Sequence, residues 1–189
     1  ATCGPSRLMP RPLPPRTVPP DEADLGGTWR GFMDLALAEA LEAARCGEAP
    51  VGAVLLSPKG EVLASGRNQS IGLNDPTAHA EILCLRRAGE KLSNYRLTGS
   101  ILVVTLEPCL MCVGALLHAR VAGVVFGAAD PKAGALVSNL DGAALPFANH
   151  RLWVLGGILA EECGGLLKRF FQQRRKGEAG ACAPGRQRL

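Results

Sequence analysis

Apolar residues along this chain recur first at helical spacing and then at strand spacing. After Thr28, a residue favoured as an N-cap, apolar side chains return every third or fourth position and charged residues lie between them. This pattern predicts an amphipathic helix that covers one face of a sheet. Residues 51–56 and 61–65 are two short runs separated by Ser-Pro-Lys-Gly, which predicts a β-hairpin with a tight turn.

The second half of the chain alternates between helical and strand patterns. In chain order these patterns predict a helix over residues 78–91, a strand over 101–106, a helix over 109–118, strands over 121–127 and 151–155, and a helix over 159–175. Residues 101–106 are apolar and rich in β-branched side chains, as is typical of a central strand. The alternation favours an α/β fold, in which a sheet with parallel members carries helices on both faces.

The two ends of the chain differ in composition from its middle. Residues 1–24 hold seven of the 14 prolines and little apolar periodicity, which predicts a disordered, proline-rich extension. Residues 177–189 are polar and contain glycine, which predicts a flexible tail. We expect residues 25–176 to form a single domain, because 189 residues suffice for one well-buried core.

Composition restricts the class of protein only moderately. Hydrophobic residues at 47% and charged residues at 20% are ordinary for a globular chain, and no apolar run of about 18 residues predicts a membrane span. A formal net charge of +4 permits nucleic-acid binding without establishing it. Seven cysteines, an odd number in a chain without a secretory segment, argue against a disulfide framework and predict a reducing, cytoplasmic location.

One histidine and two cysteines have the chemistry of a zinc site. His79, Cys109 and Cys112 offer one imidazole and two thiolates, a set that suits Zn²⁺ and leaves a fourth position open for water. The two cysteines follow Pro108, a residue favoured at the first position of a helix. Both thiols are therefore expected on one side of a helix's opening turn, where the dipole favours thiolate over thiol.

Glu81 is the candidate proton carrier. It follows His79 by two residues, which on a continuous helix would place the two side chains about 200° apart. Both can reach one metal only at a helix entrance, and Thr77 after Asp75 and Pro76 supplies start signals there. A carboxylate beside a metal-bound water acts as a proton shuttle.

Two further residues are weaker candidates for the same site. His118 lies six residues after Cys112, about 120° round the helix from the site face, so a helix-end histidine is the favoured interpretation. Glu107 adjoins Pro108, but Glu81 already fills the role of the acid, and a catalytic role for Glu107 is not favoured.

The spacing H-x-E followed by P-C-x-x-C, which His79, Glu81, Cys109 and Cys112 provide, is the signature of zinc nucleobase deaminases. Over about residues 32–175 the chain also resembles the bacterial tRNA adenosine deaminases, in the segments 48–54, 94–97, 104–109, 149–150 and 170–171. The resemblance implies a cytidine-deaminase-like fold, with three α/β/α layers around a mixed five-stranded sheet. It also implies one Zn²⁺ per subunit and a homodimer in which both subunits contribute to substrate binding.

The same resemblance implies hydrolysis of adenosine to inosine at the wobble position of a tRNA anticodon loop. Glu81 would take the proton of the zinc-activated water, pass it to ring N1, and later protonate the departing ammonia. Asn68, Asp130, Asn149 and His150 match family positions around the flipped nucleotides, although each could equally cap a loop.

Phe170 and Phe171 match family positions next to the anticodon loop, on a last helix that also carries Arg174 and Arg175. From the residues alone, aromatic side chains at helical spacing are more often core than base platforms. In the family, the position of Val103 is usually aromatic and that of Val137 is usually glycine. These two departures leave pocket packing and loop contacts open.

Two other functions compete with this hypothesis. The same fold and metal set could deaminate a free nucleobase, guanine or cytosine, and would then need no RNA surface. The chain could also be a zinc-stabilised RNA-binding subunit without turnover. Glu81 and the open zinc position count against the second alternative.

Overall fold

The computed structural model describes residues 18–176, so most of the predicted extension (1–17) and the whole predicted tail (177–189) lie outside the described residues. The predicted boundary at residue 24 falls inside a 3-10 helix, Glu22–Leu25. Asp21 caps this helix by accepting a hydrogen bond from the backbone N–H of Ala23, and Leu25 is buried against the helix that follows. A single buried leucine and a local cap thus form a turn that the composition of the segment does not indicate.

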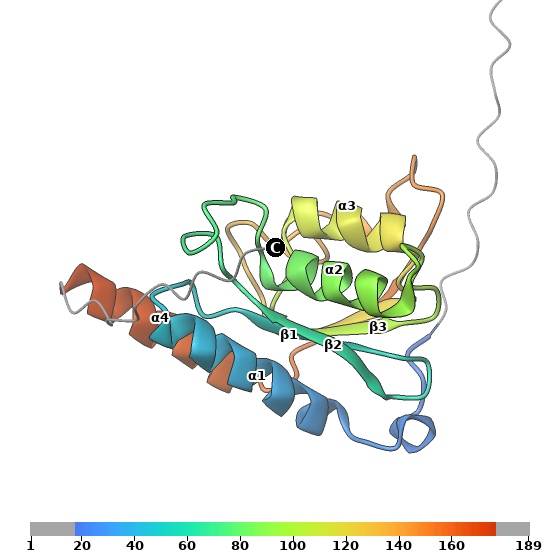
Figure 1. The fold of residues 1–189 in the computed structure, drawn as a ribbon, viewed down its shortest axis with the longest axis horizontal. Coiled ribbons are helices and arrows are strands. Elements are labelled where there is room, and N and C mark those ends of the chain that lie inside the picture. Colours follow the sequence, from blue (N-terminus) through green and yellow to red (C-terminus); the bar gives the residue numbers. More distant parts are fainter. Residues whose placement is uncertain (1–17, 177–189) are drawn as a thin grey trace, which may run out of the picture.

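A mixed sheet of five strands forms the middle layer (Figure 1). The strands are β1 (Gly52–Leu56), β2 (Val62–Arg67), β3 (Ile101–Leu106), β4 (Gly123–Ala128) and β5 (Trp153–Gly156), in the spatial order β2-β1-β3-β4-β5. β1 is antiparallel to both β2 and β3, while β3, β4 and β5 run parallel. The predicted hairpin, the central strand and the parallel members of the sheet are all confirmed.

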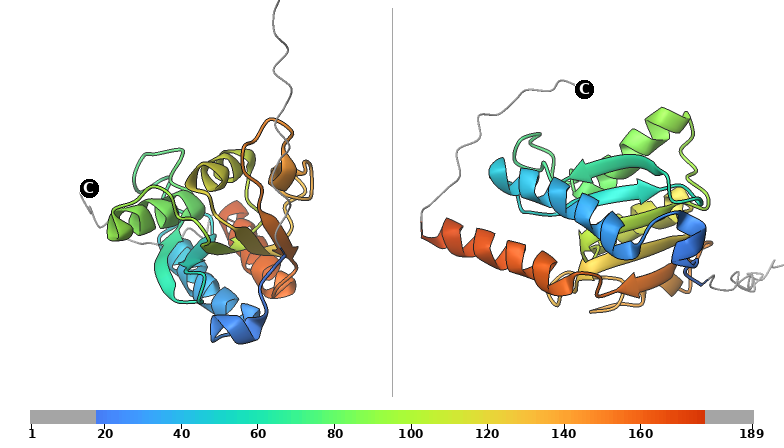
Figure 2. Two further views of the ribbon diagram at one scale, coloured as in Figure 1. Left: turned by 90° about the vertical axis from the view of Figure 1, so that its right-hand side faces the viewer. Right: turned by 90° about the horizontal axis from the view of Figure 1, so that it is seen from below.

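Two helices cover each face of the sheet. They are α1 (Trp29–Arg45), α2 (Ala80–Leu92), α3 (Leu110–Ala119) and α4 (Ala160–Arg175), with a short 3-10 helix at Gly142–Ala144. Figures 1 and 2 show α2 and α3 on one face, and α1 and α4 on the other. Thr28 caps α1 as predicted, accepting a hydrogen bond from the N–H of Gly31. Among the described residues, no helix is long and apolar enough to cross a membrane.

Alternating side chains of β3 divide the core into two halves. Leu102 and Val104 are buried with α2 and α3, whereas Ile101 and Val103 are buried with α1. A strand buried on both faces needs a continuous apolar run, which explains why this segment lacks polar alternation. Val103, which replaces the family's usual aromatic residue, is fully buried on the α1 side.

The layers bring the starts of α2 and α3 to the same edge of the sheet, at the carboxyl end of the parallel strands (Figure 1). Open α/β sheets bind ligands at this edge. Gly66 on β2 lets α2 approach closely, because a Cβ at this residue would lie 2.5 Å from the Ala80 carbonyl oxygen and 2.9 Å from the Cys84 nitrogen. The first turn of α2 therefore depends on the absence of a side chain on the strand beneath it.

We predict that Gly66→Ala lowers the free energy of unfolding by about 1–3 kcal/mol, because the new methyl group overpacks against helix backbone that cannot yield easily. Urea unfolding of the zinc-loaded protein measures this change. Gly114→Ala on α3 is the matched control, since its Cβ would meet no atom within 4 Å. Equal stabilities of the two variants would show that α2 is not held this closely.

Candidate active site and metal centre

His79, Cys109 and Cys112 lie together at the shared edge of α2 and α3. His79 is the N-cap of α2, Cys109 is the N-cap of α3, and Cys112 lies in the first turn of α3. The His79 Nδ1 atom is 3.7 Å from the Cys109 Sγ and 3.6 Å from the Cys112 Sγ, and the two sulfur atoms are 3.7 Å apart. Among the described residues, they form the one group of three such side chains close enough to hold a metal ion.

These distances fit a tetrahedral zinc ion. Zinc–sulfur bonds of about 2.3 Å and zinc–nitrogen bonds of about 2.0–2.1 Å place tetrahedral ligands about 3.8 Å apart for two sulfur atoms and about 3.6 Å apart for nitrogen and sulfur. The three observed separations agree with these values. Three protein ligands leave one position for water, as in catalytic rather than structural zinc sites.

The start of α3 differs from its prediction. The sequence places Pro108 at the first helical position, but the helix begins at Leu110 and Cys109 keeps extended backbone angles. The reason lies in a distant loop: the Ala135 N–H donates to the Pro108 carbonyl at 2.9 Å, and Cys109 forms a β-bridge with Gly134. These contacts hold the segment in front of the helix in an extended conformation.

The cluster favours a thiolate. Hydrogen bonding with the Cys112 thiol, followed by that with the His79 ring, lowers the pKa of Cys109 to about 3. The hydrogen bond with Cys109, together with burial, raises the pKa of Cys112. A metal ion would meet ligand atoms already arranged for it.

Glu81 lies beside the cluster in the first turn of α2. Its side chain is only 3% exposed, and its Oε2 is one of two buried side-chain atoms among the described residues that have no hydrogen-bond partner. Burial raises the pKa of Glu81. Because α2 begins at Ala80 and not at residue 78, His79 and Glu81 meet at the helix entrance as predicted. An orphaned carboxylate oxygen next to three zinc ligands fits a water molecule between them.

The loop before α2 contains Asn68 and is held by an acid that sequence analysis missed. The Asn68 Oδ1 accepts the Ala80 N–H at 2.8 Å, so Asn68 lies at the site entrance and also caps α2. The carboxylate of Glu48, 4% exposed, accepts the backbone N–H groups of Ile71 and Gly72. An acidic residue in the short segment that leads into the buried strand β1 is the signal that could have revealed Glu48, because buried acids need partners.

The loop after β4 contains Asp130 and is held by Glu107. Glu107 is 2% exposed and accepts hydrogen bonds from the backbone of Asp130 and of residues 136–138. Burial raises the pKa of Glu107, but hydrogen bonds from Ser138 and its neighbours outweigh that effect and lower it overall. The Asp130 Oδ1 accepts the Lys132 N–H, which is the loop-capping role considered for it.

Asn149 and His150 do not reach the zinc ligands of their own chain. Arg120, the C-cap of α3, donates to the backbone and side-chain oxygens of Asn149, and the His150 Nε2 contacts the Val121 carbonyl at 2.7 Å. A helix of 10 residues spans about 15 Å, and Cys109 lies at its other end. His118 is in the last turn of α3, so it is not a fourth ligand.

Phe170 and Phe171 lie on α4, which extends beyond the sheet (Figure 2). Phe170 is 7% exposed and Phe171 is 43% exposed, and their rings meet edge to face at 5.3 Å. The Arg174 guanidinium lies 5.6 Å from the centre of the Phe170 ring. Phe170 thus belongs to the core, and Phe171 lies at the surface.

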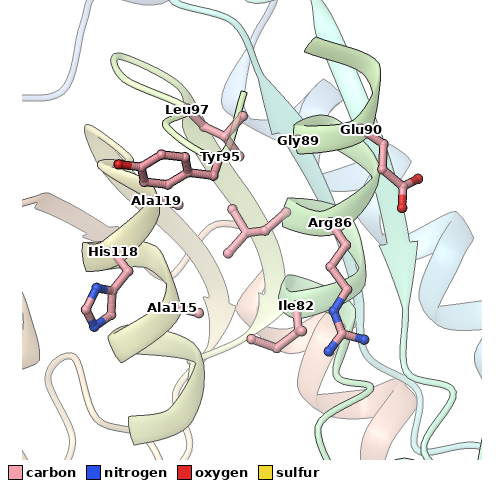
Figure 3. A pocket seen from close by; sticks show the side chains of 10 residues that line it. Ile82, Arg86, Gly89, Glu90, Tyr95, Leu97, Ala115, His118 and Ala119 are labelled. Atoms are coloured by element: carbon pink, nitrogen blue, oxygen red, sulfur yellow. The ribbon is translucent and has the colours of Figure 1, made fainter. Parts of the chain in front are cut away.

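A groove of about 600 Å³ lies between α2 and α3 on their outer side (Figure 3). Its lining is mainly apolar and includes Ile82, Leu85, Tyr95, Leu97, Ala115 and His118. Neither the zinc ligands nor Glu81 contribute to this lining. The groove is therefore separate from the candidate active site and lies on the exposed face of the two helices.

Residues 28–128, over half of the chain, match the family model of the cytidine and deoxycytidylate deaminase zinc-binding region. The chain belongs to this family. A tRNA-specific adenosine deaminase of Haemophilus influenzae is 49% identical to it over 145 residues, which cover 77% of this chain and 84% of that protein. As a member of the family the chain is a zinc-dependent deaminase, and its predicted resemblance is confirmed.

Two solved structures of deaminases share the fold. One comes from studies of A-to-I editing by tRNA:A34 deaminases at the wobble position of transfer RNA; it has a TM-score of 0.70 and 43% identity, covering 72% of this chain and 98% of that chain. The other is a guanine deaminase of Bacillus subtilis, with a TM-score of 0.50 and 40% identity over 52% of this chain and 63% of that chain. The predicted three-layer, cytidine-deaminase-like α/β fold is confirmed.

We predict that Cys109→Ala loses stoichiometric zinc and lowers the melting temperature, because two remaining ligands cannot close a tetrahedral site and metal binding contributes to folding. Metal analysis of the purified variant and thermal unfolding with and without a chelator measure both effects. Cys46→Ala, at the C-cap of α1, is the control and should keep its zinc. Full zinc occupancy in Cys109→Ala would show that the ligand set is wrong.

Proposed function

We propose that this deaminase converts adenosine to inosine at the wobble position of a tRNA anticodon by hydrolysis. The observation that carries the proposal is the orphaned, buried carboxylate oxygen of Glu81 beside three side chains at zinc-ligand spacing. The 49% identity to a tRNA-specific adenosine deaminase supports adenosine in tRNA as the substrate. The 43% identity to a tRNA:A34 deaminase structure supports the wobble position.

In the mechanism that we propose, His79, Cys109 and Cys112 hold the zinc ion. When bound, zinc lowers the pKa of a water molecule toward neutrality and so supplies a nucleophile at physiological pH. Glu81 accepts the proton that this water loses and gives it to ring N1 as the oxygen–C6 bond forms. Glu81 then takes the remaining proton from the new hydroxyl group on C6 and transfers it to the exocyclic nitrogen, and the C6–N bond breaks with loss of ammonia as the C6 carbonyl forms.

The environment of Glu81 suits a group that must both take and give a proton. A carboxylate in water stays ionised at neutral pH and is a poor acid there. Burial of Glu81 raises its pKa, which brings the acid form within reach during turnover. The backbone of α2 fixes the distance to His79, so the proton carrier stays beside the nucleophile.

A target base has to leave its stack to enter so enclosed a site. Bases in a single-stranded loop flip out at lower cost than bases inside a duplex, which suits an anticodon loop. We propose that Asn68 and Asp130, on the loops that flank the cluster, contact the flipped nucleotides. We further propose that Phe170, Phe171 and the basic end of α4 contact neighbouring nucleotides and phosphates.

We also propose a homodimer, in which each site is completed by a second copy. Leu110 at the start of α3 and Phe147 near its far end are both exposed, and the groove between α2 and α3 adds a hollow apolar surface. A two-fold pair with antiparallel α3 helices would bury these residues. It would also bring Asn149 and His150 of one copy toward the zinc ligands of the other.

The reduced cysteines that the zinc site requires agree with a cytoplasmic enzyme, and tRNA is available there.

A free-base deaminase is the competing function, and the similarity to a guanine deaminase, which covers 52% of this chain, favours it. Incubation with bulk tRNA followed by inosine mapping, in parallel with ammonia release from guanine, cytosine and adenine, separates the two. Inosine at wobble positions supports the proposal, and ammonia only from a free base overturns it.

We predict that Glu81→Gln retains one zinc per chain and its fold but slows deamination by at least about 100-fold, since amide nitrogen cannot exchange protons as a carboxylate does. Single-turnover deamination, metal analysis and thermal unfolding provide the three measurements. Glu61→Gln, in the hairpin away from the cluster, serves as the control. Substantial deamination by Glu81→Gln would remove this residue from the mechanism.

We predict that replacing Arg174 and Arg175 by alanine weakens tRNA binding and reduces its salt dependence. The slope of log K against log salt should be smaller by about 0.7–0.9 for each phosphate that the variant no longer neutralises. Binding titrations at several salt concentrations measure the slope. Lys59→Ala, in the turn of the β-hairpin, removes a cation elsewhere and should leave the slope unchanged. Unchanged tRNA binding by the double variant would show that the end of α4 has only a structural role.

A further inference from the structure

Five hydrogen bonds join one carboxylate to the loop that follows β4. The Oε1 atom of Glu107 accepts the backbone N–H groups of Leu136, Val137 and Ser138 at 3.1, 2.8 and 2.9 Å. Its Oε2 accepts the Asp130 N–H at 3.1 Å and the hydroxyl of Ser138. The two ends of the loop, residues 130 and 138, are thus tied to the same side chain.

The carboxylate has no capacity left for a proton-transfer role. Two carboxylate oxygens offer about four lone-pair sites, and Glu107 already accepts five donors. The loop backbone also passes directly over it, because a Cβ at Gly134 would lie 2.4 Å from the Glu107 carboxyl carbon. Glu107 therefore holds the loop in place, and the loop backbone covers its carboxylate.

The same loop is attached to the zinc-ligand segment. Gly134 forms a β-bridge with Cys109, and the Ala135 N–H donates to the Pro108 carbonyl. The loop consequently lies against the start of α3, with Asp130 at its beginning. Val137, held by Glu107 through its N–H, directs a side chain that is 65% exposed away from the protein.

We propose that Glu107 is a positioning residue that fixes the loop 130–138 beside the metal cluster as a preformed wall for the substrate. It acts on substrate binding through Asp130 and Val137, and not on zinc or on proton transfer. A loop fixed before binding loses little conformational entropy when the substrate arrives, so its contacts contribute to affinity. This inference rests on the proposed function for the identity of the substrate, but the hydrogen bonds between Glu107 and the loop are independent of it.

Glu107→Gln tests the role sharply, because glutamine keeps the shape and one oxygen acceptor. The amide NH₂ in place of Oε2 would face the Asp130 N–H, a donor opposite a donor. We expect one zinc per chain, kcat within about twofold, and KM for tRNA raised about tenfold or more, the pattern expected when binding common to ground and transition states is weakened. Hydrogen exchange at residues 136–138 should become faster, since these amides lose their shared acceptor.

Two further variants, one with a smaller expected effect and one control, accompany Glu107→Gln. Ser138→Ala removes one side-chain hydrogen bond and should raise KM by a smaller factor. Glu42→Gln, at a half-exposed acid on α1 across the sheet, is the matched control and should change none of the readouts. If Glu107→Gln does not fold, Ser138→Ala decides alone: KM must rise while kcat and zinc content hold.

Three outcomes would overturn the inference. A fall in kcat at constant KM would give Glu107 a part in the chemistry, and loss of zinc would make it a support of the metal site. Unchanged KM together with unchanged exchange at residues 136–138 would show that the loop does not depend on it. If the parent protein deaminates only a free base, the proposed function fails, and the exchange data with KM for that base still decide the role of Glu107.

Discussion

The site depends on two helices that begin side by side with a ligand as their N-cap. His79 and Cys109 both have extended backbone angles, with ψ of 156° and 171°, so each side chain stands in front of its helix and not on its flank. A shift of either helix start by one residue would turn the following side chains by about 100° and separate the ligands. The positive dipole ends of both helices also favour negative charge at this point, which stabilises thiolates and would stabilise the hydroxide that a bound zinc ion supplies.

Three buried acids near this centre have different hydrogen-bond environments, and the environment separates their roles. Glu48 and Glu107 have their oxygens occupied by backbone N–H groups of the two loops that flank the cluster. Glu81 alone among them has a carboxylate oxygen without a partner. A buried carboxylate whose oxygens are all hydrogen-bonded is fixed by its donors, whereas an orphaned oxygen leaves a position for one more donor. The same residue type thus fixes a loop in two places, and in the third it has the arrangement expected of the proton carrier that we propose.

The sequence predicts what depends on local pattern and ligand chemistry. Every helix and strand expected from apolar spacing is present, and the three side chains predicted as zinc ligands, His79, Cys109 and Cys112, lie close enough together to hold a metal ion. What it does not predict depends on contacts between distant segments. The extended start of α3 is set by a hydrogen bond from Ala135, and Glu107 finds its donors 23 to 31 residues later in the chain. Local periodicity carries no information about such long-range hydrogen bonds, so these partners can be identified only from the folded structure.

The length of α3 explains why one chain would supply the chemistry but not the whole binding surface. Arg120 at its C-cap fixes Asn149, while the ligand Cys109 is its N-cap. Residues expected near the substrate therefore lie at both ends of one rigid helix, and no loop motion within the chain would close a gap set by a helix. In the homodimer that we propose, an antiparallel second copy would remove the conflict, because it would reverse the helix and exchange its ends. Under this arrangement the apolar face of α2 and α3 would serve stability and substrate binding together, whereas the zinc cluster and Glu81 remain complete within each chain.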